Sequence, residues 1–243
     1  HVLCEKPLAV SVGEAQQMAA ACSERGVVLM EAFMYRHHPQ HALARSLFDR
    51  QEVGRLRLIR ASFSFFHATP RGNIRFMPEL EGGALMDVGC YVLNAARLIA
   101  DSEPVAVHAV QRVSTEFGVD VSVSILLEFP NDLHATLDVG FDRIGGGRYE
   151  MAGEHGTVMV ANAFTPGVQP VAVTLQLSDR VETLQVASVN QYALELDHFA
   201  TCVLEGRPLA PAEDGVKNTA VVDAVRTSMR EQRRVQVAAP RRY

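Results

Sequence analysis

The segment Val119-Asp120-Val121-Ser122-Val123-Ser124-Ile125-Leu126-Leu127 alternates apolar and polar side chains along almost all of its length. Because successive side chains of a β-strand point to opposite faces, this pattern predicts a strand with one buried face. The turn residues Pro130-Asn131-Asp132 follow, and the alternation resumes with Leu133, Ala135, Leu137, Val139 and Phe141. Together the two segments predict an antiparallel hairpin that covers a core on one side.

Segments on both sides of this hairpin extend the antiparallel pattern. Tyr149 to Ala152 and Thr157 to Ala161 predict a second hairpin, and Val171 to Leu177 with Val181 to Ala187 predicts a third. Upstream, Leu56 to Phe66 is also expected to be a strand. The sequence therefore predicts a large, mainly antiparallel sheet.

Apolar residues at helical spacing occur before and after these strands. His41 to Arg50 and Asp87 to Ala100 are expected to be helices. Two closing helices are indicated by the apolar stripes Leu196, Phe199, Ala200 and Val203, and Val221, Ala224 and Val225. We expect these helices to cover one face of the sheet.

The first thirty residues have a different character. His1 to Cys4 and Val27 to Met30 are short apolar runs that suit buried strands, and a helix is expected between Ser11 and Glu24. Strand, helix and strand in this order form one βαβ unit of a parallel sheet. The expected fold class is α/β (α+β): the end of a Rossmann parallel sheet, followed by an α/β domain with an open antiparallel sheet.

Composition restricts the class of protein further. The chain has 243 residues, 48% of them hydrophobic, and a formal charge of -5, which is typical of a globular protein and not of a nucleic-acid binder. Its four cysteines form no Cys-x-x-Cys motif, so neither a zinc site nor a disulfide framework is predicted. The longest uncharged stretch, Thr157 to Ser178, contains prolines, and no membrane span is expected. These features and the lack of a signal peptide favour a cytoplasmic location.

Glu5-Lys6-Pro7 directly follows the first strand. Ligands bind at the carboxyl ends of the strands in open α/β sheets, so an acid, a lysine and a proline at this point would form a polar ledge. A cis Lys6-Pro7 bond is one option there. The alternative is a surface turn that begins the next helix.

A second segment, Gly82 to Tyr91, carries Asp87 and Tyr91 four residues apart, which places them on one face of a helix. The two glycines before them permit a close approach of the backbone to a ligand. A phenol beside an ammonium group would serve as an acid or base, because a positive charge lowers the pKa of tyrosine. The alternative is a buried helix in which Tyr91 belongs to the core and Asp87 caps the start.

Three ordered motifs resemble the family of glucose-fructose oxidoreductase and inositol dehydrogenase. They are Glu5-Lys6-Pro7-Leu8-Ala9, then Glu31-Ala32-Phe33-Met34-Tyr35-Arg36 with His38-Pro39, and Gly82-Gly83-Ala84-Leu85-Met86-Asp87-Val88-Gly89-Cys90-Tyr91. The closing stretch from Asn190 to Val237 is also similar. Tyr91 stands where the inositol branch has histidine, which resembles the branch that contains xylose dehydrogenase and dimeric dihydrodiol dehydrogenase.

The resemblance implies an NAD(P)-dependent dehydrogenase that moves a hydride to or from a hydroxyl carbon of an aldose such as xylose, or of a cyclic diol. It also implies Tyr91 as the general acid or base, Lys6 as its helper and Asp87 as the residue that orients or tunes the pair. Reduction of a keto-sugar by the same residues is a second interpretation. A non-catalytic relative that serves in oligomerisation or ligand sensing is a third.

Further residues are candidates for binding. Glu5, Lys6, Pro7 and Arg36 are expected to contact NADP or NAD. The loop from Thr69 to Glu81 is expected to line the substrate pocket through Arg71, Asn73 and Arg75, unless it is simply a solvated basic loop. His37, His38 and His41 are not expected to bind a metal, because no carboxylate completes the set.

The domain organisation follows from what the chain lacks. The glycine-rich dinucleotide fingerprint is absent, and Gly145-Gly146-Gly147 does not have its spacing. We therefore interpret residues 1–33 as the end of a Rossmann domain and residues 34–243 as the substrate-binding and oligomerisation domain. About a hundred residues are expected before His1, and without them we expect weak cofactor binding. Face-to-face pairing of the antiparallel sheet would give a homo-oligomer, a dimer or tetramer, if that face is exposed and apolar; the alternative is that both faces are covered.

Overall fold

The computed structural model describes residues 1–50, 52–68, 70–205 and 212–239. Within them a large sheet has the strand order β10-β9-β8-β7-β3-β6-β5-β4-β11, and β1 pairs with β2 in a separate parallel sheet. The strands are β1 (Val2–Glu5), β2 (Leu29–Ala32), β3 (Leu56–Ser64), β4 (Ala106–Val113), β5 (Asp120–Glu128), β6 (His134–Gly140), β7 (Gly146–Gly153), β8 (Gly156–Val160), β9 (Val171–Leu177), β10 (Val181–Val186) and β11 (Val235–Gln236). The helices are α1 (Val12–Glu24), α2 (Pro39–Phe48), α3 (Cys90–Ala100), α4 (Gln191–Glu205) and α5 (Ala212–Glu231).

All three expected hairpins are present. β5 pairs with β6, β7 with β8 and β9 with β10, each antiparallel. The sheet also contains two features that the sequence patterns did not predict. β4 lies beside β5, and β3 lies between β6 and β7, parallel to β6 and antiparallel to β7.

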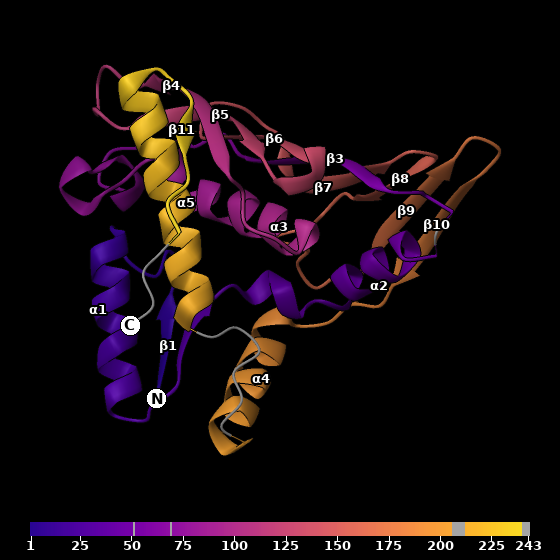
Figure 1. Ribbon diagram of the computed structural model, residues 1–243, viewed down its shortest axis with the longest axis horizontal. Helices are drawn as coiled ribbons and strands as arrows, with labels where there is room; N and C mark the ends of the chain where they lie inside the picture. The colour runs from indigo at the N-terminus through magenta and orange to yellow at the C-terminus, as the bar shows by residue number, and fades with distance from the viewer. Residues whose placement is uncertain (51, 69, 206–211, 240–243) are drawn as a thin grey trace.

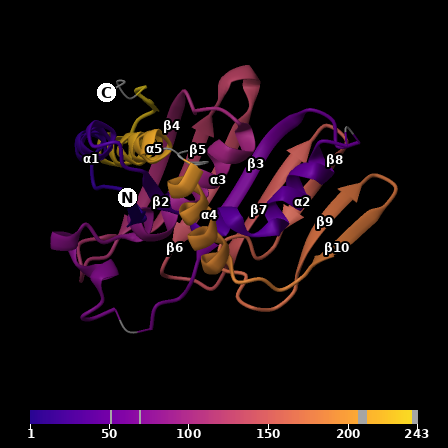
Figure 2. The ribbon, with the colours of Figure 1, turned by 90° about the horizontal axis from the view of Figure 1, so that it is seen from below.

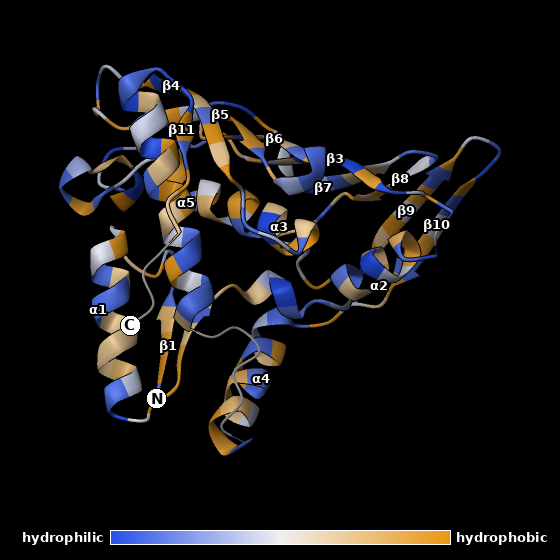
Figure 3. Cartoon of the chain, viewed as in Figure 1, coloured by the Kyte–Doolittle hydropathy of each residue, from blue (hydrophilic) through white to orange (hydrophobic). Residues whose placement is uncertain are grey.

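Helices cover one face of this sheet, as expected. The sheet runs across the top of Figure 1, with α2 and α3 beneath it and α5 running down from the level of β4 at its left edge, and Figure 2 shows the molecule from below. The core forms between these layers, where the apolar side chains of the alternating strands point. In β5 and β6, Val123, Leu127, Ala135 and Val139 are all fully buried. Figure 3 shows the mixed hydropathy along the strands that this one-sided burial produces.

The N-terminal βαβ unit is also present. β1 and β2 run parallel in register from Val2 with Leu29 to Glu5 with Ala32. Ser11 accepts a hydrogen bond from the backbone N–H of Glu14 at 3.3 Å, which caps the start of α1. A small core unites this unit with α5, which lies beside α1 in both views, and contains Leu8, Ala15, Ala19, Leu29 and Val216.

The expected helix from Asp87 to Ala100 consists of two parts. A π-helical turn, η4 (Leu85–Gly89), precedes α3. π-turns inside helices are frequent at functional sites. Pro78–Ala100 is also the one described segment whose length and composition would suit a membrane helix, but 78% of its most apolar 18-residue stretch is buried within the protein. It is therefore part of the core of this fold.

Candidate active site

The Glu5-Lys6-Pro7 ledge lies at the carboxyl end of β1, and its Lys6-Pro7 bond is cis. The ammonium of Lys6 reaches across to η4, where it donates hydrogen bonds to the backbone carbonyl of Asp87 at 2.8 Å and to its Oδ1 at 3.0 Å. The side chain of Glu31 also holds the turn after Lys6, because its Oε1 accepts a hydrogen bond from the N–H of Leu8 at 2.8 Å. The ledge is thus fixed to two other segments.

Burial controls the charge of the supporting carboxyl group. Glu31 lies at the end of β2 and is buried, and its Oε2 has no partner among the described residues. Burial raises the pKa of Glu31 to about 8, an effect that the hydrogen bond from Leu8 opposes. Glu31 therefore holds its proton at neutral pH.

The glycine pair before Asp87 has a structural role. Gly83 has a φ of 123°, and a Cβ at this position would lie 2.1 Å from Oδ1 of Asp120. The second oxygen of Asp120 accepts a hydrogen bond from the N–H of Leu85 at 2.7 Å. Asp120, and not Asp87, thus caps the start of this helical segment, and the close approach that Gly83 permits is to Asp120.

Asp87 is held between two cations. In addition to Lys6, Nε of Arg75 lies 2.5 Å from Oδ2 of Asp87. The side chains of Lys6 and Asp87 are each only 15% exposed, so the ion pair is partly shielded from water. Asp87 therefore fixes the positions of both cationic groups.

Tyr91 lies beside the ledge. The Nζ of Lys6 is 5.1 Å from the centroid of its ring, a cation–π arrangement. Its hydroxyl donates a hydrogen bond to the sulfur of Met34 at 3.3 Å, and Phe33, Phe63 and Phe164 surround the ring. Burial raises the pKa of Tyr91 above its ordinary value, and the neighbouring Cys90 adds to the rise. The predicted lowering of this pKa by Lys6 is wrong here, because the ring is desolvated and the ammonium lies over its face.

Lys6, Asp87, Tyr91 and Arg75 line one cavity of about 560 Å³. Sequence patterns did not identify several other lining residues, which include Met34, Phe65, Gly145, Tyr192 and Glu195. Glu195 is the most informative of these. It is 5% exposed, and its Oε1 has no hydrogen-bond partner among the described residues. Burial and the nearby Glu5 raise the pKa of Glu195 to about 7.

The remaining predicted binding residues are dispersed. Arg36 is directed away from this cavity and pairs with Asp214, with Nη1 and Oδ2 separated by 2.5 Å. Arg71 is exposed and pairs with Glu116, while the side chain of Asn73 accepts a hydrogen bond from the N–H of Arg75. Of the predicted loop residues Arg71, Asn73 and Arg75, only Arg75 lines the cavity. Pro7 is absent from the described lining, and Thr69, where this loop was expected to begin, lies outside the described residues.

The three histidines that invited a metal interpretation have separate partners. Nδ1 of His38 accepts a hydrogen bond from the N–H of Gln40, and His41 lies 3.0 Å from the hydroxyl of Tyr149. The ring of His37 packs against that of His198. No group of three metal-ligating side chains is present in the part of the chain that the structure describes.

Comparison with known proteins identifies the class. Residues 41–159 match the GFO/IDH/MocA C-terminal domain, and residues 1–33 match an oxidoreductase family with an NAD-binding Rossmann fold. The matches define an NAD(P)-dependent oxidoreductase that acts on CH–OH groups. The chain belongs to the GFO/IDH/MocA family.

Three relatives illustrate the similarity. A dTDP-3,4-didehydro-2,6-dideoxy-alpha-D-glucose 3-reductase of Actinomadura kijaniata is 36% identical over 95% of this chain and 70% of its own length. An NADP-dependent D-xylose 1-dehydrogenase of Haloferax volcanii is 35% identical over 93% of this chain and 69% of its own. The aldose-aldose oxidoreductase of Caulobacter crescentus, solved with glycerol, superposes with a TM-score of 0.89 at 32% identity, covering 97% of this chain and 72% of that one.

The residues of the site fit the reactive end of the cofactor. Glu5 ends β1 and Lys6 follows it, at the edge where open α/β sheets bind nucleotides, and the adjoining cavity contains the unpartnered buried oxygen of Glu195. A nicotinamide ring and a small substrate together suit a cavity of this size and polarity. A glycine-rich phosphate loop is not part of the sequence. The cavity therefore suits the nicotinamide end of the cofactor.

Proposed function

We propose that the protein transfers a hydride between NADP(H) or NAD(H) and a hydroxyl-bearing carbon of a sugar, such as an aldose like xylose, or of a cyclic diol. Lys6, Asp87 and Tyr91 are the proposed catalytic residues. The observation that carries the proposal is their convergence on one cavity at the end of β1, with Lys6 bonded to Asp87 and located above the ring of Tyr91. The nicotinamide, when bound, donates or accepts the hydride.

Tyr91 transfers the proton. Its hydroxyl is held by a thioether, which is a weak acceptor, so a substrate oxygen can replace Met34 as the partner at little cost. The raised pKa keeps the proton on the phenol, which is the form that protonates a carbonyl oxygen during reduction. This observation favours the reduction of a keto-sugar as the second candidate reaction, and the same group receives the proton when the alcohol is oxidised.

Lys6 and Asp87 have supporting roles. The ammonium of Lys6 lies 5.1 Å from the ring centroid of Tyr91 and stabilises negative charge that develops on the substrate oxygen. Asp87 contacts Lys6 through both its backbone carbonyl and its carboxylate, which fixes the ammonium before substrate binds. Fixed positioning of this kind lowers the reorganisation needed in the transition state.

Residues 1–33 are proposed to be the last βαβ unit of a nucleotide-binding domain, and residues 34–243 to be the substrate domain. The match of residues 1–33 to an NAD-binding Rossmann family supports this division, as does the coverage of about 70% of the relatives' length. Glu5, Lys6, Pro7 and Arg36 stay predicted cofactor contacts, and Arg71, Asn73 and Arg75 stay predicted substrate contacts. A cytoplasmic location also stays a prediction.

The test is Tyr91→Phe in the intact gene product, because phenylalanine keeps the ring and removes only the hydroxyl. We expect kcat to fall by about 10²–10⁴, the usual contribution of a general acid or base. The affinity for NADP(H), measured by titration calorimetry, should change less than twofold. Unchanged turnover would refute the role of Tyr91 and favour the non-catalytic alternative.

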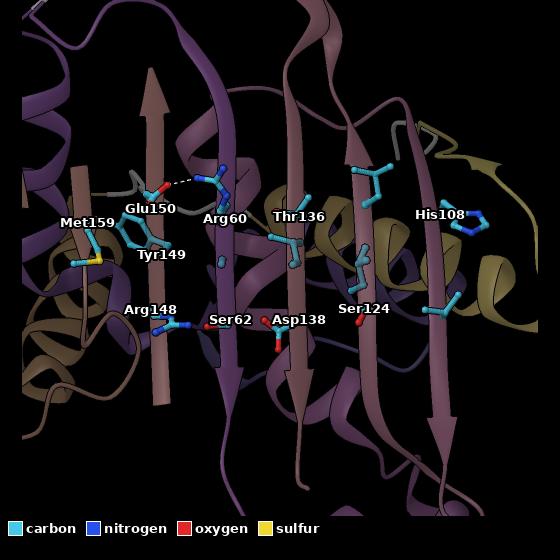
Figure 4. Close-up of a pocket in the computed structure, with 15 residues that line it drawn as sticks. Arg60, Ser62, His108, Ser124, Thr136, Asp138, Arg148, Tyr149, Glu150 and Met159 are labelled. Atoms are coloured by element: carbon cyan, nitrogen blue, oxygen red, sulfur yellow. Dashed lines mark hydrogen bonds and ion pairs between the residues drawn. The ribbon is translucent and has the colours of Figure 1, made fainter. Parts of the chain in front are cut away.

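We also propose that the uncovered face of the sheet is an oligomerisation surface. Figure 4 shows this face, where a depression of about 680 Å³ crosses β8, β7, β3, β6, β5 and β4. Oligomerisation was expected if an exposed face of the sheet is apolar. This face is exposed but mixed in character, since the exposed Val110, Leu126 and Met159 lie on it beside Arg60, Glu150, Arg148, Asp138 and Thr136. Leu126→Glu should convert a dimer or tetramer to monomers in sedimentation analysis, whereas an unchanged mass would contradict the proposal.

A further inference from the structure

The cavity beside Tyr91 contains carboxylates without cationic partners. Its basic lining residues within the described part of the chain are Lys6 and Arg75, and both form ion pairs with Asp87. The two cations share this single carboxylate. Glu5 and Glu195 line the same cavity, and neither side chain has an ion pair among the described residues. Lys6, Arg75 and Asp87 together carry one positive charge, which the carboxyl groups of Glu5 and Glu195 offset, so the cavity has no excess of positive charge to attract an anion.

Glu195 is built into this position by α4. The first turn of α4 is capped by Asn190, whose side chain accepts hydrogen bonds from the N–H groups of Tyr192 and Ala193. The side-chain amide of Gln191 donates a hydrogen bond to the backbone carbonyl of Phe164. The ring of Phe164 in turn contacts the ring of Tyr91. Tyr192 and Glu195 are three residues apart, so both face the cavity. The local structure thus directs a buried carboxyl group at the site.

A buried carboxylate oxygen without a partner is costly, and such groups in folded proteins usually serve a ligand. The hydroxyl groups of a sugar are the matching chemistry, because each is a hydrogen-bond donor without charge. A phosphate group would meet the carboxyl groups of Glu5 and Glu195, neither of which has a cationic partner among the described residues. The cavity is therefore matched to a neutral polyol.

Resting on the proposed function, we propose that Glu195 determines specificity by accepting a hydrogen bond from a hydroxyl of an uncharged aldose or polyol, and that together with Glu5 it disfavours phosphorylated and nucleotide-linked sugars. Under this proposal the substrate is a free sugar, whereas the relative that is 36% identical is named for the reduction of a dTDP-linked sugar. A hydrogen bond to a partly ionised carboxyl group typically contributes ~10-fold to binding.

The experiment compares wild type, Glu195→Gln and Glu195→Asp in the intact gene product, with D-xylose, D-glucose and glucose 6-phosphate as probes. Asp197→Asn is the matched control, since it removes the same charge from an exposed position two residues along α4. We expect Glu195→Gln to raise KM for the free sugars ~10-fold or more and to narrow the preference for glucose over glucose 6-phosphate. Glu195→Asp should weaken sugar binding but keep the discrimination against phosphate.

Three results would overturn the proposal: unchanged sugar KM in Glu195→Gln, an effect confined to the affinity for NADP(H), or a wild-type preference for glucose 6-phosphate. Absence of turnover with every sugar and both cofactors would count against the proposed function instead. In that case, equilibrium binding of the free sugars to wild type and Glu195→Gln in the presence of NADP⁺ still tests the role of Glu195, because loss of binding supports it and equal binding refutes it.

Discussion

The ammonium of Lys6 lies 2.8 Å from the carbonyl oxygen of Asp87 and 3.0 Å from its carboxylate, although 81 residues separate the two in sequence. One bond is to a backbone atom, which no substitution of the Asp87 side chain removes. The N-terminal ledge is therefore attached to the helical segment that carries Tyr91 by two hydrogen bonds from one ammonium group, of which the bond to the backbone does not depend on the Asp87 side chain.

Lys6→Met should reduce kcat by about 10²–10³, as expected when one donor that stabilises developing negative charge is lost. Thermal stability should change little, since Arg75 stays paired with Asp87. Lys217→Met is the control, because Lys217 is the only other lysine in the sequence and is about half exposed. Equal activities of the two variants would contradict the role of Lys6.

Glu31→Gln should change how stability depends on pH. An unfolded glutamate titrates near pH 4.5, whereas burial raises the pKa of Glu31 to about 8 in the folded protein. Between these values the folded protein holds a proton that the unfolded chain has released, so stability falls as pH rises through this range. The glutamine variant does not titrate at this position. Between pH 5 and pH 9 its free energy of unfolding should therefore rise by a few kcal/mol relative to that of wild type, since one pKa unit corresponds to about 1.4 kcal/mol.

Urea unfolding at several pH values measures this relative gain. The charges that face Glu31 are those of Asp214, Arg97 and Arg36, and none of them is altered by the substitution. Glu14→Gln, the same chemical change at an exposed position in α1, should run parallel to wild type. A Glu31→Gln curve that also runs parallel to wild type would show that Glu31 is ionised in the folded protein.

Arg97→Met should destabilise the fold by about 1–3 kcal/mol, because it removes the buried guanidinium that holds Asn218, Asp214 and Glu103 together, although Asp214 keeps its pair with Arg36. Arg97 is only 4% exposed and joins Glu103, Asp214 and Asn218. The exposed Arg45, which pairs with Asp49 one turn away, provides the control. Arg45→Met should change the free energy of unfolding by less than about 0.5 kcal/mol. A similar cost for both substitutions would argue against a buried network.

Gly83→Ala should cost at least about 2 kcal/mol, because a side chain at a φ of 123° is strained and its Cβ would collide with Asp120. Displacement of Asp120 also releases the N–H of Leu85, so turnover should fall with stability. Gly13→Ala, in α1 with nothing within 4 Å of the added Cβ, should be neutral or stabilising by up to about 1 kcal/mol. Calorimetric Tm values distinguish the two variants, and a tolerated Gly83→Ala would disprove the collision.

Local patterns predicted the hairpins well because alternation along a strand directly reflects which side chains are buried. β5 illustrates this, with Val121, Val123, Ile125 and Leu127 all in the core. β4 was not predicted, because only Ala106, Val107 and Ala109 of its residues are buried and the alternation stops after them. The parallel pairing of β3 with β6 joins distant segments, which periodicity does not encode.

The site was predictable to the extent that its residues occur in short motifs. Lys6, Asp87 and Tyr91 were found in this way, and the structure brings them together. Glu195 was missed because one glutamate in an amphipathic helix carries no local signal. The pKa of Tyr91 was predicted in the wrong direction. The motif shows the charge of Lys6, but it does not show the desolvation that Phe33, Phe63 and Phe164 cause around the ring.

Helix α5 has a consequence for protein engineering. Its Val216 completes the small core of Leu8 and Leu29, and a Cβ on Gly215 would lie 2.7 Å from Leu8, while farther along the same helix Val221 and Val225 pack under the large sheet. A chimaera joined at residue 33 would separate Leu8 and Leu29 from the helix that covers them. Exchange of nucleotide-binding halves between relatives should therefore succeed only when the first turns of α5 are transferred together with residues 1–33.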